Sequence, residues 1–159
     1  MIFFGVGILV IGVCIYFVFA ETKGRHLELK GEILKIRTGK LGEDDSIAVL
    51  DLRLQNISDI PWMVRQVEVT VDKADGTPAT GSNIAKSDLK QLFQYNRFLG
   101  EQYNDSLAIR DTIPPHEKVD RMVAMRFEMK STDLDAAKAI HVSVQEMDGP
   151  LFEITKSLK

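Results

Sequence analysis

Residues 50–81 read LDLRLQNISDIPWMVRQVEVTVDKADGTPATG. Leucines at 50, 52 and 54 alternate with polar residues, and so do valines at 67, 69 and 71. This period of two is typical of a β-strand with one buried face. Pro61 interrupts the chain between the two runs, and Asp75-Gly76 indicates a tight turn because glycine adopts positive φ at low steric cost. The stretch therefore predicts two strands separated by a break and followed by a turn.

The same period appears further along the chain. Apolar residues alternate with polar residues or alanine over 123–129 and 140–145, and weaker strands are expected over 27–36, 107–113 and 151–155. About seven strands at this spacing predict a mainly β fold, an antiparallel β-sandwich of immunoglobulin or fibronectin-III-like kind. Leu52, Val69 and Phe127 are expected to face its core.

Two segments depart from this rhythm. Ser87 is expected to cap one inserted helix over 88–99, and Thr132 with Asp135 resembles a capping box for a shorter helix. The first helix lies within the long connection 81–106. Connections of that length in compact domains are often functional.

Aromatic residues crowd this connection. Leu89, Phe93 and Asn96 define a stripe of about 100° that a docked helix buries, whereas Tyr95 and Phe98 fall outside it. Tyr95, Phe98 and Tyr103 are therefore the candidate interaction surface, because exposed aromatic side chains serve as anchors in protein interfaces. The competing interpretation is that these rings close an open end of the sandwich.

Residues 2–20, IFFGVGILVIGVCIYFVFA, carry no charged side chain. As a helix they extend about 28 Å, close to the ~30 Å hydrocarbon core of a bilayer. We expect a transmembrane helix (signal anchor) over 1–20, a linker over 21–26 and the β-sandwich domain over 27–159. Val18-Phe19-Ala20 leaves signal-peptidase cleavage open, although the apolar run exceeds the usual signal-peptide core of about 7–15 residues.

The remaining residues indicate no chemistry. A net charge of −3 without a basic cluster argues against nucleic-acid binding. The three histidines, His26, His116 and His141, share no metal-ligand spacing, and the only cysteine, Cys14, lies in the apolar segment. Nucleotide-binding and hydrolase motifs do not occur in the sequence. We expect no catalytic, cofactor-binding or metal-binding residues, no cofactor, and no enzymatic activity.

Residues 50–81, together with IPPHEKVDRMVAMRFEM at 113–129, resemble the late-embryogenesis-abundant group-2 (water-stress) domains and the bacterial FxLYD-type modules. The shared layout is a strand ending in Asn56, a break, a strand of alternating valines, an Asp-Gly turn, and a proline step into a long strand. The resemblance implies a membrane-anchored fibronectin-type sandwich without enzymatic activity, displayed outside the cytoplasm. Lys23 and Arg25 argue for the cytoplasm by the positive-inside rule, and the resemblance outweighs them.

These observations predict a single-pass membrane protein with its C-terminal domain on the extracytoplasmic (periplasmic) side. Its expected role is a non-enzymatic interaction or structural subunit of a membrane or envelope protein complex. The expected partners are the lipid bilayer, through residues 2–20, and other membrane or envelope proteins. The alternative is a binding module for a small apolar or lipid-like ligand, held at the sandwich end against the helix over 88–99.

Overall fold

The computed structural model describes residues 11, 13, 15, 16 and 27–158. The expected transmembrane helix (1–20) and linker (21–26) therefore lie outside the described residues, except for a few helical positions whose side chains are exposed: Ile11, Val13, Ile15 and Tyr16. In the described part of the chain, no helix is both long enough and apolar enough to cross a bilayer.

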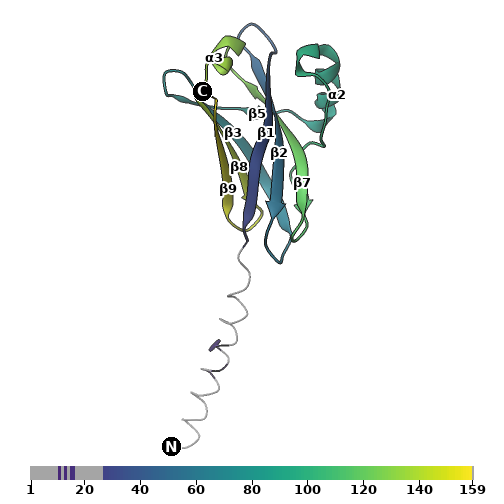
Figure 1. Cartoon of the computed structure of the whole chain (residues 1–159), viewed down its shortest axis with the longest axis vertical. Helices are drawn as coiled ribbons and strands as arrows, with labels where there is room; N and C mark the ends of the chain where they lie inside the picture. The colour runs from purple at the N-terminus through teal and green to yellow at the C-terminus, as the bar shows by residue number, and fades with distance from the viewer. Residues whose placement is uncertain (1–10, 12, 14, 17–26, 159) are drawn as a thin grey trace, which may run out of the picture.

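Two antiparallel sheets pack against each other, which confirms the expected mainly β sandwich (Figure 1). The four-stranded sheet has the order β1-β2-β7-β5, and the five-stranded sheet has β4-β3-β8-β9 in order with β6 paired to β3. The strands of the first sheet are β1 (Leu29–Lys40), β2 (Ser46–Asn56), β5 (Ser82–Asn83) and β7 (Lys118–Phe127). Those of the second are β3 (Trp62–Asp72), β4 (Pro78–Thr80), β6 (Thr112–Ile113), β8 (Ala139–Glu146) and β9 (Leu151–Ser157).

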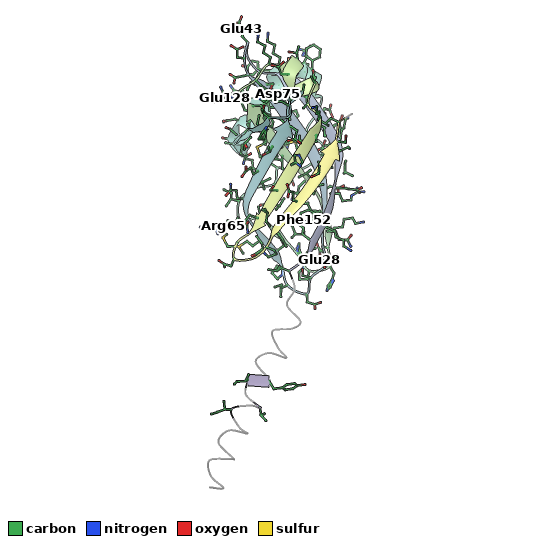
Figure 2. The ribbon with its side chains drawn as sticks, turned by 90° about the vertical axis from the view of Figure 1, so that its left-hand side faces the viewer. Glu28, Glu43, Arg65, Asp75, Glu128 and Phe152 are labelled. Atoms are coloured by element: carbon green, nitrogen blue, oxygen red, sulfur yellow. The ribbon has the colours of Figure 1, made fainter. Side chains whose placement is uncertain are left out.

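The strands define two ends of the sandwich. Figure 2 shows Glu28 and Arg65 toward one end, which we call proximal, and Glu43, Asp75 and Glu128 toward the other, which we call distal. Strand β1 starts at the proximal end and, at about 3.3 Å per residue, extends about 40 Å to the distal end. Any feature at the end of β1 is therefore far from the point where the N-terminal segment joins the domain.

The main core lies between the two sheets. Leu52, Val69 and Phe127 each have 0% exposure and belong to it, so the expected inward phase of their strands is confirmed. Strand β8 keeps the alternation along its whole length. Burying such large apolar side chains stabilises a domain by about 1.5–3 kcal/mol each.

The prediction that each strand buries only one face, however, is wrong for the centres of β2 and β7. Residues 46–52 and 122–125 are buried whichever way their side chains point. Their outward side chains form a second core with two leucines from the 81–106 connection: Ile47, Val49, Leu89, Leu99, Met122 and Ala124. The first sheet is therefore covered on both faces.

The helices in the described part are α2 (Lys86–Tyr95), the 3-10 helix η1 (Arg97–Leu99) and α3 (Ser131–Asp135). The predicted caps are wrong, because Ala85 and Lys130 occupy the N-cap positions and neither side chain makes a capping hydrogen bond. Ser87 Oγ donates to the Asp88 carboxylate instead. The helix expected to reach residue 99 ends at Tyr95, because the next residue, Asn96, has a φ of −107° and a ψ of 82°, which are not helical.

The strand expected over 107–113 is wrong for most of its length. Only Thr112 and Ile113 pair with β3. Arg110 has a φ of 71°, which is incompatible with an extended strand. The chain is thus a loop over 107–111, held by backbone hydrogen bonds from Leu107 to Met122 and from Arg110 to Val64, and becomes a strand only at Thr112.

Two residues of the quoted stretch 50–81 shape its turns. Asn56 is buried at the proximal end, where its Nδ2 donates to the carbonyls of Ile60 and Ile113 at 2.8 and 3.0 Å. It thereby ties the break after β2 to the segment that precedes β7. Gly76 has a φ of 86° in the turn between β3 and β4, the conformation expected of the Asp75-Gly76 pair.

Truncating Phe127 tests the assignment of the core. Phe127→Ala should lower the free energy of unfolding by about 3–5 kcal/mol, because it leaves a cavity between the sheets. Urea unfolding of the full chain in mild detergent, followed by the fluorescence of the buried and only tryptophan, Trp62, measures the change. Phe98→Ala is the matched control and should change it by less than about 0.5 kcal/mol, since Phe98 is exposed. Equal losses would contradict the assignment.

Candidate functional site

The connection 81–106 lies across the outer face of the first sheet. It leaves β4 through the two-residue strand β5, continues as α2 and η1, and returns beside β7, where Ser106 bridges to Met122 (Figure 1). Leu89 of α2 and Leu99 of η1 are the side chains that it buries against the sheet. Both ends of the connection are thus paired to β7, and its central helices, α2 and η1, pack on the outer face of the first sheet.

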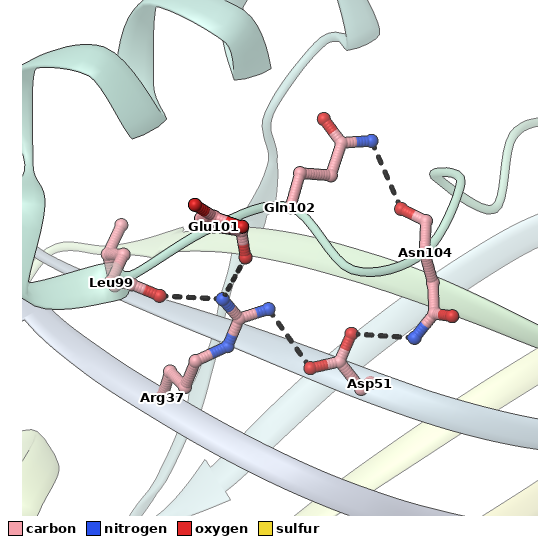
Figure 3. A network of polar contacts seen from close by, with 6 residues as sticks. All are labelled: Arg37, Asp51, Leu99, Glu101, Gln102 and Asn104. Carbon is pink, nitrogen blue, oxygen red and sulfur yellow. Dashed lines mark hydrogen bonds and ion pairs between the residues drawn. The ribbon is translucent and has the colours of Figure 1, made fainter.

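A buried arginine holds the segment after η1 on the sheet (Figure 3). Arg37 of β1 donates through Nη1 to the carbonyls of Leu99 and Glu101, at 2.6 and 2.7 Å. Its Nη2 donates to Oδ2 of Asp51, on β2, at 3.0 Å. The other carboxylate oxygen of Asp51 accepts from Asn104 Nδ2 at 3.0 Å. One ion pair therefore fixes residues 99–104, which we call the strap.

The Arg37–Asp51 pair is almost fully shielded from water, with side-chain exposures of 8% and 5%. The rings of Phe93 and Tyr103 lie 5.6 and 5.0 Å from the guanidinium, within the range of cation–π attraction. Lys35 also contacts the Tyr103 ring, at 5.2 Å. A buried ion pair contributes little net stability compared with apolar residues, but losing one partner is strongly destabilising. Its role here is to position the strap.

Tyr95 and Phe98, from the candidate interaction surface, line one groove at the distal end. They are 82% and 94% exposed. The groove has a volume of about 830 Å³ and is formed by α2, η1, the end of β1 and one residue of β7. Its lining residues are Lys40, Leu41, Ile84, Asp88, Gln91, Leu92, Tyr95, Asn96, Phe98 and Arg126.

The third predicted surface residue lies elsewhere. Tyr103 is 60% exposed, but its ring covers Arg37, and it is not among the residues that line the groove. The structure therefore brings Tyr95 and Phe98 together and separates Tyr103 from them. Tyr103 belongs with the residues that hold the strap.

The wall of the groove is held by a second ion pair. Arg126 of β7 donates through Nε and Nη2 to the carboxylate of Asp45, at 3.1 and 2.8 Å. The same contact raises the pKa of Arg126 above its ordinary value. Because Asp45 closes the loop between β1 and β2, this pair fixes the loop that carries Leu41 beside α2.

Of the three histidines, His26 lies outside the described residues, and His116 and His141 contact neighbouring side chains. His141 lies between Thr155, at 2.8 Å, and Asp72, at 3.0 Å, across β8, β9 and β3. His116 contacts Asp59 at 2.9 Å. Among the described residues, no group of three or more potential metal ligands lies close enough to hold an ion.

Sequence reasoning did not identify Arg37 and Asp51. A signal was present, because residues 47–50 form an unbroken apolar run, Ile-Ala-Val-Leu, which is typical of a strand buried on both faces. A carboxylate that directly follows such a run is buried as well and requires a cationic partner. The partner itself, one arginine among many basic residues, had no distinguishing pattern.

No protein-family model and no curated protein sequence match the chain, so the resemblance to group-2 and FxLYD-type domains stays a prediction. The chain is similar to several solved structures. An uncharacterized β-sandwich protein from Clostridium difficile 630 is 10% identical with a TM-score of 0.44, covering 79% of this chain and 83% of that one. An ApaG protein from Pseudomonas aeruginosa is 12% identical with a TM-score of 0.38, covering 75% and 95%.

Neutralising Asp51 tests the role of the buried pair. Asp51→Asn should destabilise the domain by about 3–5 kcal/mol, because Arg37 stays buried without a counter-charge. The double variant Arg37→Met/Asp51→Leu should recover most of that loss while speeding amide exchange over residues 99–104. Urea unfolding and hydrogen exchange measure the two effects. If the strap exchanged no faster in the double variant, the pair would not be what positions it.

Proposed function

We propose that this protein is a membrane-anchored, non-enzymatic interaction or structural subunit of a membrane or envelope protein complex. The observation that carries the proposal is the exposure of Tyr95 and Phe98 on a single groove. Transfer of two large exposed aromatic side chains from water into contact with a partner is favourable. Aromatic residues also dominate the energetics of protein interfaces.

The position of the groove supports a protein partner. In this proposal residues 2–20 span the bilayer as a single-pass anchor and the sandwich stands on the extracytoplasmic (periplasmic) side. Leu27 then lies next to the membrane, and the groove lies beyond the end of β1, about 40 Å away. An anchored domain also meets membrane-bound partners at a high effective concentration, so a modest groove suffices.

The edge strands β1 and β9, by contrast, carry features that oppose pairing with another chain. Lys156 on the edge strand β9 turns toward β1, where its Nζ donates to the carbonyl of Ile33 at 2.9 Å. The register of β1 shifts between Ile33 and Lys35, as in a β-bulge. Inward charges and bulges on edge strands are two ways in which proteins prevent strand addition. They favour the groove over these two edges as the contact surface.

We further infer a sandwich of immunoglobulin or fibronectin-III kind. The order β1-β2-β7-β5 corresponds to strands A-B-E-D of that fold, and β3-β8-β9 corresponds to C-F-G. Domains of this architecture carry many unrelated functions, so the function rests on the groove and not on the fold.

A small apolar or lipid-like ligand is the second candidate occupant. The groove volume of about 830 Å³ falls within the 300–1,000 Å³ usual for small-molecule sites. In the anchored arrangement, however, the groove lies about 40 Å from the bilayer, out of contact with membrane lipid, and this favours a protein partner.

Photo-crosslinking in native membranes tests the interaction role. A photoreactive phenylalanine at position 95 should give covalent adducts with another protein chain, because a partner on the groove lies within reach of that side chain. The same group at Glu153, which is exposed on the opposite sheet, is the control and should give none. Without adducts at position 95, saturable binding of a fluorescent fatty acid that Phe98→Ser abolishes would favour the ligand-binding alternative.

A reporter fused after Lys159 tests the orientation. Alkaline phosphatase, which is active only outside the cytoplasm, should be active in this fusion. The matched control is a reporter that folds only in the cytoplasm, and it should be inactive there. The reverse pattern would mean that Lys23 and Arg25 set the topology.

A further inference from the structure

The groove carries one uncompensated charge of each sign. Asn96 Nδ2 donates to the carbonyl of Lys40 at 3.0 Å, which places Lys40 at the C-terminal end of α2. Asp88 lies in the first turn of α2, about 12 Å away along the helix. Among residues 27–158, neither Lys40 nor Asp88 forms an ion pair, and the Asp88 carboxylate accepts a hydrogen bond from Ser87.

The other charged residue of the groove is already neutralised. Arg126 is bound through two nitrogen atoms to Asp45, so it offers no free charge to an occupant. Leu92, Tyr95 and Phe98 line the groove together with the two free charges. The groove is therefore basic near the C-terminal end of α2 and acidic near its first turn, and the apolar side chain of Leu92 lies midway between the two ends.

Such a pattern is complementary to itself under a two-fold rotation. Turning a second copy about an axis through the apolar centre exchanges the two ends, so that Lys40 of each copy meets Asp88 of the other. Two-fold interfaces require this self-complementarity, and dimers are the commonest protein oligomers. An apolar centre rimmed by polar groups is also the usual anatomy of a protein interface.

We infer that the groove is the interface of a two-fold dimer, in which the occupant is a second copy of this chain. The inference rests on the proposed role of this groove as a contact surface and names its partner. Leu92 lies near the axis in this arrangement, Phe98 lies on the same surface beyond Asn96, and the Lys40–Asp88 contact occurs twice. Anchoring of both copies in one bilayer raises their effective concentration.

Charge reversal in the full chain tests the arrangement. Donor and acceptor fluorescent proteins are fused after Lys159, and energy transfer is measured in liposomes over a range of protein densities. Lys40→Asp and Asp88→Lys should each weaken self-association about tenfold, because each creates two like-charge contacts. The double variant Lys40→Asp/Asp88→Lys restores both pairs and should return to within about threefold of the unmodified chain.

Two further variants complete the design. Phe98→Ser should weaken self-association by at least about tenfold, as expected when an aromatic anchor is removed. Lys90→Asp is the control, because Lys90 is exposed on α2 but does not line the groove, and it should have no effect. Circular dichroism of each variant verifies that the β-sandwich is intact.

The outcomes separate this inference from the proposed function. Three results would overturn the dimer. The full chain would not self-associate, Phe98→Ser would leave self-association unchanged, or the double charge reversal would stay as weak as the single variants. If position 95 still crosslinked to a different protein, the interaction role would stand without the dimer. If position 95 crosslinked to nothing, both would fail.

Discussion

Strand β2 is covered on both faces, by the opposite sheet on one side and by α2 and η1 on the other. A connection that only joined two strands would leave one face of β2 in water. Because Leu89 and Leu99 complete a second core there, residues 81–106 are an integral layer of the domain. Covering this face also buries charged groups. These are Arg37 and Asp51, which form an ion pair between the sheet and the strap.

The same constraint explains which features were predictable. Strands with a single buried face, such as β8, show strict alternation and are recognised from it. The first helix was placed from its apolar stripe and the second from an apparent capping box at Thr132 and Asp135, but neither start was found, because Ala85 and Lys130 carry no capping oxygen. For the site, Tyr95 could be singled out by its phase on the helix, whereas Phe98, also predicted from that phase, is exposed on η1 after α2 has ended. Tyr103 could not be separated from them, since its contact with Arg37 depends on tertiary structure.

Position also limits what the exposed aromatic residues do. Tyr95 and Phe98 lie at the end of the sandwich opposite Leu27, on a surface whose shape is fixed by the second core and by the Arg126–Asp45 pair. The edge strands β9 and β1 are protected by Lys156 and by the β1 bulge, which favours this groove over those two edges as the contact surface. A rigid groove needs little reorganisation on binding, which lowers the entropic cost of association.

The direction of β1 has a mechanical consequence. The strand runs from the proximal end, where an N-terminal tether would attach, to Lys40 at the groove. A partner pulling on the groove therefore applies tension parallel to the strands. Strand β1 is paired with β2 from Leu29 to Lys40, so the load falls on the whole ladder in shear instead of opening its hydrogen bonds one after another. With the tether and partner in the places proposed above, the sandwich would transmit force between them as a stiff body.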